Sequence, residues 1–346
     1  MKKIISIICS LMLISFLASA SQNLKFVFLV TRHGARTPVH YLKPLKYNWN
    51  MPPGQLTPQG MREEYNLGLK LRKRYVDQLK FLSHDYKDKS IYAYTGNGNR
   101  TIESALCLLM GLYPPGLGPK TFQNKNALPY RFQVIPLRTV SENTQHTNYK
   151  NALKKYFFTS ADWKNKNKQL QPYYKEWGKT FDYKIHSLID IKIIADTLLC
   201  AKNQQLTLPD GLTKKQAELI IDTSNWINTY QFKNLQVAYI ISGQLLNNIV
   251  KKLQKATKGE KQYKVVYFSG HDLNLLAQMS LLGKPLKKQP DFASFSEVEL
   301  YNDGPLWIVK VRYNGNYIKL PIMNGKDYCS LKTFINYVNI LNKKYK

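Results

Sequence analysis

The stretch FVFLVTRHGARTP, residues 26–38, joins a buried strand to a polar loop. Its apolar part, Phe26–Val30, is short, continuous and rich in β-formers, which predicts a strand covered on both faces. The loop that follows carries Arg32, His33 and Arg36. Because ligands of open α/β sheets bind beyond the carboxyl ends of the strands, this junction predicts a functional site at the end of the first strand.

Two more predicted strands lead into the same kinds of side chain. The run Ile91–Thr95 ends at a Gly-Asn-Gly-Asn turn, and Arg100 follows that turn. Further along, Tyr263–Phe268 has strand character and leads through Ser-Gly into His271 and Asp272. Three separate strand ends therefore present three arginines, two histidines and one aspartate, and we expect them to meet at one edge of the sheet.

The remaining periodicity alternates between helix and strand. Helices are predicted from residue 57, over 101–112 and over 273–282, a third strand over 131–136, and a hairpin from 295–301 and 306–313 around an Asn-Asp-Gly turn. Alternating strands and helices predict an α/β fold with a mostly parallel sheet and helices on both faces. Aromatic and lysine-rich residues 148–230, helical in 185–199 and 213–230, predict a mostly helical insertion into an α/β catalytic domain of residues 21–147 and 231–346.

The first twenty residues have the pattern of a secretory signal peptide. Lys2 and Lys3 precede the apolar run Ile4–Leu17, and Ala18–Ala20 fits a cleavage site. We therefore expect residues 1–20 to be removed and the protein to be secreted or delivered to a lysosomal or other lumenal compartment. No later apolar run reaches the roughly 18 residues of a bilayer span, so no membrane span is expected in the mature chain.

The charge and cysteine content narrow the function classes. The 346 residues include 51 Lys and Arg against 22 Asp and Glu, a formal net charge of +29, but only nine of the basic residues are arginines and the lysines are scattered. A diffuse lysine excess is typical of a solvated surface, so we expect no nucleic-acid partner. Beyond the signal, Cys107, Cys200 and Cys329 allow at most one disulfide, and no cysteine-histidine cluster indicates a metal.

The strand-end residues suit the chemistry of a phosphoryl group. Guanidinium forks match phosphate oxygens two at a time, and three of only nine arginines lie at these strand ends. Flanking arginines disfavour protonation of His33, which would keep it a neutral nucleophile in acid. His271 is able to donate a hydrogen bond to a transferring oxygen. Like charge from a bound phosphate would raise the pKa of Asp272 and make it a general acid.

The pattern Arg32-His33-Gly34-x-Arg36-x-Pro38, with His271-Asp272 far downstream, resembles the signature of histidine acid phosphatases, branch 2 of the histidine phosphatase superfamily. The resemblance covers most of residues 26–149 and 265–338. It implies a phosphoglycerate mutase-like α/β fold with a smaller, mostly helical inserted domain. It implies acid hydrolysis of small phosphate monoesters without cofactor or metal through a phosphohistidine on His33, with Asp272 as proton donor. The family's phosphate-binding residues correspond to Arg32, Arg36, Arg100 and His271.

The sequence leaves open two functions other than that of an acid phosphatase. A phytase-type inositol phosphate hydrolase would share both motifs. A catalytically impaired phosphate-binding protein is the other, since Asn99 stands where members of the family usually place an Asp before the third arginine. A homodimer is neither required nor excluded.

Overall fold

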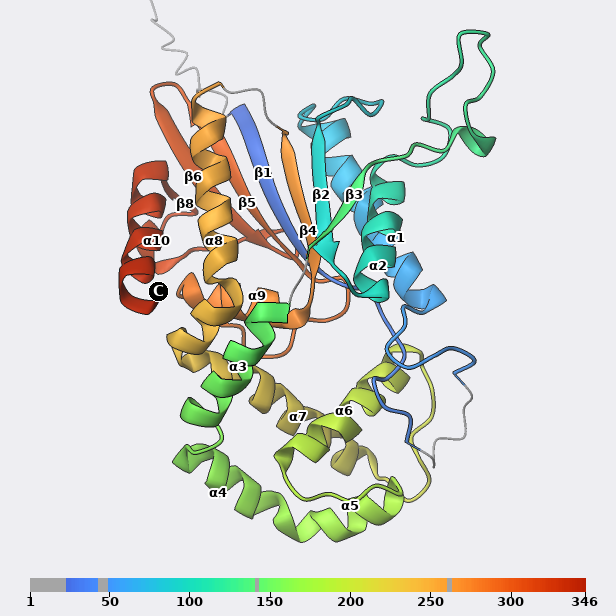
Figure 1. The fold of residues 1–346 in the computed structure, drawn as a ribbon, viewed down its shortest axis with the longest axis vertical. Helices are drawn as coiled ribbons and strands as arrows, with labels where there is room; N and C mark the ends of the chain where they lie inside the picture. Colours follow the sequence, from blue (N-terminus) through green and yellow to red (C-terminus); the bar gives the residue numbers. More distant parts are fainter. Residues whose placement is uncertain (1–22, 43–48, 141–142, 260–262) are drawn as a thin grey trace, which may run out of the picture.

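The structure is a computed structural model that describes residues 23–42, 49–140, 143–259 and 263–346 (Figure 1). Its strands form one mixed sheet in the order β3-β2-β4-β1-β5-β6-β7, with β8 paired to β6. The strands are β1 (Asn23–Arg32), β2 (Ile91–Gly96), β3 (Leu137–Val140), β4 (Val265–Gly270), β5 (Phe295–Asp303), β6 (Leu306–Tyr313), β7 (Asn316–Tyr317) and β8 (Tyr328–Ser330). The predicted strands at 26–30, 91–95 and 263–268 and the predicted hairpin are confirmed.

The sheet has a parallel half and an antiparallel half. The pairs β1·β4, β2·β4 and β2·β3 are parallel, whereas β5 pairs antiparallel with β1 and β6. The predicted third strand at 131–136 is wrong, because pairing begins only at Leu137. Pro136 has no N–H to donate to a ladder, and Tyr130 and Arg131 have φ values of 52° and 50°, which are incompatible with extended chain.

Helices cover both faces of the sheet, as the alternation of side chains along β1 requires. Val27 and Leu29 pack with α1 (Pro58–Arg72) and α2 (Asn99–Leu112) in one core cluster. Phe26, Phe28 and Val30 pack on the other face with α8 (Leu235–Thr257), α9 (Asp272–Leu281) and α10 (Leu331–Tyr345). The strand is therefore buried on both sides, and the predicted α/β fold class is confirmed.

A helical part with its own core lies beyond the carboxyl ends of the parallel strands, at the bottom of Figure 1. Its helices are α3 (Asn143–Tyr156), α4 (Ala161–Leu170), α5 (Tyr174–Thr180), α6 (Leu188–Asn203) and α7 (Lys214–Tyr230). The core between them contains the fully buried Trp177 and Phe181 together with apolar residues of α6 and α7. Thr213 caps α7 through a capping box with Gln216, which explains why that helix begins where it does.

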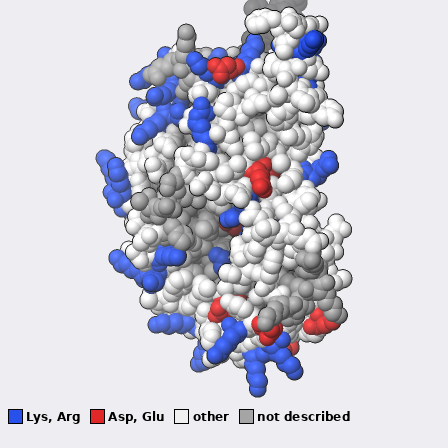
Figure 2. Space-filling model, turned by 45° about the vertical axis from the view of Figure 1, so that its right-hand side comes forward, with Lys and Arg blue, Asp and Glu red and all other residues white. Residues whose placement is uncertain are grey.

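Several sequence predictions concern the surface and the ends of the chain. The signal peptide predicted for residues 1–20 lies outside the described residues. No helix in the described part of the chain is long and apolar enough to cross a bilayer. Cys107, Cys200 and Cys329 are all free thiols. Lys and Arg side chains are spread widely over the face drawn in Figure 2, which matches the scatter of lysines in the sequence.

Candidate active site

The register of the parallel strands brings the two motif histidines together. Arg32, the last residue of β1, lies opposite Gly270, the last residue of β4. His33 and His271 directly follow these two residues, so they become neighbours although they are 238 positions apart in the chain. The backbone N–H of His33 donates to Gly270 O at 3.0 Å, and the two imidazole centroids are 5.4 Å apart at an interplanar angle of 74°.

The loop after β1 is held against the N-terminal halves of α1 and α2. Gly34 N donates to the Ser104 hydroxyl at 3.1 Å, and Ala35 N donates to the Glu63 carboxylate at 2.8 Å. A Cβ on Gly34 would lie 2.4 Å from the carbonyl oxygen of Gly60, so only glycine fits this approach of loop to helix. The motif glycine therefore sets the distance between the loop and α1.

His33 is buried and has one ring nitrogen engaged by the backbone. Its Nδ1 lies 2.9 Å from the carbonyl oxygen of Gly34. A carbonyl only accepts, so Nδ1 carries the proton and the lone pair of the neutral ring is on Nε2. Burial, followed by the neighbouring Arg32, His271 and Arg36, lowers the pKa of His33 well below its usual 6.5. The ring therefore stays neutral at a lower pH than a free imidazole does, and this is the protonation state that the predicted role of His33 requires.

Arg32 is fixed from three sides. Its Nη1 donates to the carbonyl of Pro290, its guanidinium carbon lies 4.2 Å from the ring centroid of Phe292, and its Nη2 lies 3.6 Å from a carboxylate oxygen of Asp272. Among the described residues its buried Nε has no hydrogen-bond partner. A buried N–H without a partner is rare in folded proteins, and it indicates a place for an anionic ligand.

Arg36 is held by α6 of the helical part. Its two Nη atoms donate to the two carboxylate oxygens of Asp196 at 2.7 and 3.1 Å, and Nη1 also lies 3.7 Å from Cys200 Sγ. Asp196 additionally accepts from Val39 N at 2.9 Å, so it fixes both the side chain and the loop. The Nε of Arg36, like that of Arg32, is buried and has no partner within the described parts of the chain.

Arg100 and His271 complete the predicted set. Arg100 is in the first turn of α2, and its Nη1 would lie 3.9 Å from a Cβ placed on Gly54, in the loop that precedes α1. Its charge contributes to the lowered pKa of His33. His271 caps α9, and its backbone N–H donates to Asn274 Oδ1 at 2.8 Å. All six residues predicted for the site therefore come from three strand ends that face the same region.

The surroundings of Asp272 favour its ionised form. Its Oδ1 accepts from Leu273 N at 2.8 Å, and its Oδ2 accepts from the amide of Gln289. Burial acts to raise the pKa of Asp272, but the surrounding positive charges, Arg32 first and then Lys192, together outweigh burial and lower the pKa to about 2. The raised pKa expected from the sequence applies to the site with phosphate bound, and it stays a prediction. That expected rise depends on the negative charge of the phosphate.

Sequence reasoning missed the polar residues that surround this set. Asp196 and Lys192 lie four residues apart on α6, so they share one face of that helix, and Gln289 lies in the loop before β5. The charge of Lys192 acts on the carboxylates of Asp196 and Asp272. The helical spacing on α6 is visible in the sequence, but nothing local indicates that this face turns toward a loop 160 residues earlier.

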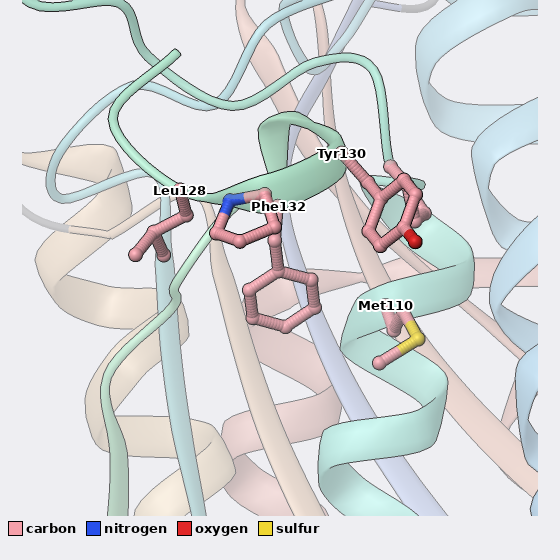
Figure 3. A pocket seen from close by; sticks show the side chains of 6 residues that line it. Met110, Leu128, Tyr130 and Phe132 are labelled. Carbon is pink, nitrogen blue, oxygen red and sulfur yellow. The ribbon is translucent and has the colours of Figure 1, made fainter.

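The apolar pocket drawn in Figure 3 lies elsewhere. It has a volume of about 570 Å³ and is lined by Met110, Pro115, Leu128, Pro129, Tyr130 and Phe132. Met110 is ten residues along α2 from Arg100, which places it about 15 Å away at the usual helical rise. The pocket contains none of the predicted site residues and takes no part in the chemistry discussed below.

Comparison with known proteins places these residues in a family context. The sequence model described as histidine phosphatase superfamily (branch 2) matches residues 23–320. Prostatic acid phosphatase of Rattus norvegicus is 30% identical over 310 residues, covering 85% of this chain and 79% of that protein. Lysosomal acid phosphatase of Xenopus laevis is 29% identical over 298 residues, covering 82% of this chain and 67% of that protein.

Solved structures share the fold at lower sequence identity. The phytase of Klebsiella sp. ASR1 superposes with a TM-score of 0.66 at 15% identity, over 92% of this chain and 96% of that one. Hafnia alvei phytase in complex with myo-inositol hexakis sulphate gives a TM-score of 0.65 at 16% identity, over 93% of this chain and 97% of that one. Both show that the chain shares the fold of these proteins over most of its length.

Proposed function

The chain belongs to branch 2 of the histidine phosphatase superfamily, and on that premise we propose that it is an acid phosphatase. It hydrolyses small phosphate monoesters through a covalent phosphohistidine on His33 and needs no metal or cofactor. The observation that carries the proposal is a neutral, buried His33 beside two arginines whose Nε donors lack partners in the described residues. Both relatives described above are named acid phosphatases.

In the first step the phosphoryl group moves from the substrate to the enzyme. The lone pair on His33 Nε2 attacks phosphorus while Arg32, Arg36, Arg100 and His271 neutralise the charge of the non-bridging oxygens. The ester P–O bond breaks, and its electron pair goes to the leaving oxygen. The proton on that oxygen comes from Asp272, because an alkoxide is a poor leaving group without one.

The second step returns the enzyme to its starting state. A water molecule attacks the phosphohistidine, its proton passes to the Asp272 carboxylate, and the P–N bond electrons return to His33. Asp272 must therefore be an acid before the first step and a base before the second. Its pKa of about 2 in the free site suits the base, and the negative charge of bound substrate raises it toward the acid form.

Hydrolysis of phosphate monoesters between pH 3 and 8 in the presence of a chelator tests the proposal. We expect acid-favoured turnover, a loss of at least about 10³-fold in His33→Ala, and phosphohistidine in alkali-quenched wild-type enzyme by ³¹P NMR. Asp272→Asn should slow an alkyl phosphate about 10²-fold or more, and p-nitrophenyl phosphate, which leaves without a proton, much less. Undiminished turnover in His33→Ala would disprove the covalent role of that residue.

A phytase-type inositol phosphate hydrolase is the second candidate, favoured by the fold shared with two phytases. Comparison of kcat/KM for phytate with simple aryl and sugar phosphates separates the two. A correctly folded wild-type protein that binds phosphate saturably but hydrolyses none of these substrates would instead be a phosphate-binding protein. We propose export to the cell exterior or a lysosomal compartment, in line with the name of the Xenopus laevis relative.

A further inference from the structure

Gln289 links the predicted proton donor to the helical part of the protein. Its Nε2 donates to Asp272 Oδ2, and its Oε1 accepts from Asn228 Nδ2 at 2.9 Å. Its backbone N–H donates to Asn225 Oδ1 at 3.1 Å, so the loop is tied to α7 independently of the side chain. The side-chain amide is therefore able to rotate while the backbone stays in place.

Asn228, at the other end of this chain of hydrogen bonds, is buried with 2% of its surface exposed. Its Nδ2 donates to Gln289 and, at 3.4 Å, to the Ser224 hydroxyl. In the described structure its Oδ1 has no hydrogen-bond partner. A buried amide oxygen without a partner requires an explanation, because nearly all such groups in native proteins are paired.

The observed arrangement favours the ionised form of Asp272. Both carboxylate oxygens receive N–H donors, from Leu273 and from Gln289, and a protonated carboxyl needs an acceptor for its own O–H. In the proposed reaction Asp272 alternates between acid and base in every turnover. A fixed donor at Oδ2 would oppose the acid form each time.

We propose that Gln289 and Asn228 act as an amide switch that accommodates both protonation states of Asp272. When Asp272 is ionised, Gln289 donates from Nε2, as observed. When Asp272 is protonated, the Gln289 amide turns over, so that Nε2 points to Asn228 and Oε1 accepts the carboxyl O–H until the leaving oxygen of the substrate replaces it as the acceptor. The Asn228 amide turns over with it, and its Oδ1 accepts from Nε2.

The Asn228 amide makes the same number of hydrogen bonds in both arrangements. In the first, Oδ1 is without a partner in the described structure. In the second, Asn228 Nδ2 is the atom without a partner. The Ser224 hydroxyl then turns so that it donates to Asn228 Oδ1. Neither arrangement is strongly preferred, so the protonation state of Asp272 selects between them. Both amides are positioning residues, since neither is required to touch the reacting atoms.

Other charges also act on Asp272, and a test must separate them from the switch. The ionisable side chains whose charge interacts with this carboxylate are Arg32, Arg36, Tyr149, Lys192 and His271. All of them stay in place when only an amide of the switch is changed.

The first test uses the leaving group as its readout and rests on the proposed function. Gln289→Leu removes both the donor and the acceptor at Asp272. We expect kcat for an alkyl phosphate such as glycerol 2-phosphate to fall about 10-fold or more, and kcat for p-nitrophenyl phosphate to change less than about 3-fold. Asn225→Ala, which removes only the backbone tether, should affect both substrates equally. An equal loss on both substrates in Gln289→Leu would overturn the switch.

The second test does not depend on turnover. Asn228→Asp presents only acceptor oxygens when ionised, so it holds Gln289 with Nε2 toward residue 228 and Oε1 toward Asp272. The ¹³C NMR titration of the Asp272 carboxyl should then show a raised pKa. Asn225→Asp is the matched control, because it adds the same charge one turn away on α7. It also keeps the side-chain oxygen that accepts from the backbone N–H of Gln289.

The two variants together decide the proposal. A clearly larger rise in the pKa of Asp272 in Asn228→Asp than in Asn225→Asp supports the switch, and equal rises attribute the effect to charge alone and overturn it. If Asn228→Asp does not fold, Gln289→Leu in the same titration serves instead, with a raised pKa expected from loss of the donor to the carboxylate. A wild-type protein without phosphatase activity would refute the proposed function but leave this titration valid.

Discussion

Gly34 shows how one residue fixes the position of a nucleophile. The next residue after His33 lies against Gly60 of α1 so closely that a methyl group there would overlap the Gly60 carbonyl. Gly34→Ala should therefore destabilise the protein by about 1–3 kcal/mol or more and lower activity, because the loop must move away from α1. Thermal unfolding and turnover measure the two effects.

Gly98→Ala is the control for that substitution. A Cβ on Gly98 would meet its nearest atom, Thr101 Oγ1, at 3.6 Å, which is ordinary contact. We expect a loss of at most about 1 kcal/mol in this variant, because Gly98 is the N-cap of α2 and glycine is a better N-cap than alanine. If Gly34→Ala unfolded at the same temperature as Gly98→Ala, the close approach of loop and helix would not limit the fold.

Asp196 illustrates a residue that acts through another. It holds the Arg36 guanidinium through two hydrogen bonds to its Nη atoms, which leaves Nε directed elsewhere. Asp196→Ala should raise KM for phosphate monoesters about 10-fold, because hydrogen bonds to charged groups contribute about 1.5–3 kcal/mol and Arg36 would lose its orientation. Steady-state kinetics provide the measurement. The control variant is Asp222→Asn, which changes an exposed carboxylate on α7. An unchanged KM would remove Asp196 from the site.

At the scale of elements, the π-helical turn η1 (Lys73–Gln78) at the end of α1 builds a buried network on β5. Arg74 donates to Glu299 at 2.8 Å, and the Tyr75 hydroxyl lies 2.6 Å from Glu297 and 2.7 Å from Glu299. The two glutamates are two residues apart on one strand, so they lie on the same face. Arg312 of β6 is 2.8 Å from the Glu297 carboxylate. Two acids and two arginines are thus enclosed together.

This network predicts that stability falls as the pH rises above the usual range of a carboxyl group. Burial raises the pKa of Glu297 to about 7 against 4.5 for a free glutamate, despite the opposing charge of Arg312. Between these values the folded state holds a proton that the unfolded state has lost, so the stabilising contribution is complete below pH 4.5 and lost by about pH 7. The loss is up to about 3 kcal/mol.

Urea unfolding at pH values from 4.5 to 7 checks this slope, with Glu297→Gln as the informative variant. The amide cannot ionise, so we expect a flatter profile. Burial also raises the pKa of Glu64 on α1 well above 4.5, which adds slope of the same sign, and Glu64→Gln should flatten the profile separately. Identical profiles for wild type and both variants would exclude the two carboxyls as its source.

At the scale of the whole molecule, most of the fold could be predicted from local sequence patterns. The apolar runs that form β1, β2 and β4 and the polar residues directly after them are contiguous in sequence, so both the strands and the grouping of six polar residues at their ends were predictable. The position of β3 was not, because a run with strand character contained Pro136 and left-handed residues before it. Its strand begins only where backbone N–H donors become available for the ladder.

The rest of the site depends on contacts that no local pattern encodes. Asp196 reaches Arg36 across 160 residues, and Gln289 reaches Asn228 across 61. Their helices and loops are recognisable, but which face meets the strand ends is decided by packing of the helical part against the sheet. For the same reason nothing in the sequence indicated that Lys192 lies near Asp272 and acts to lower its pKa.

The pairing of β1 with β4 also determines when the protein becomes competent during folding. A chain that has formed β1, β2 and their helices possesses His33, Arg36 and Arg100, but it has neither His271 nor Asp272 until β4 inserts between β1 and β2. The insertion closes a loop of more than 200 residues, a contact that forms late in a chain of this size. Recovery of turnover during refolding would therefore follow completion of the central sheet. A nascent or truncated chain lacking β4 would be catalytically inactive.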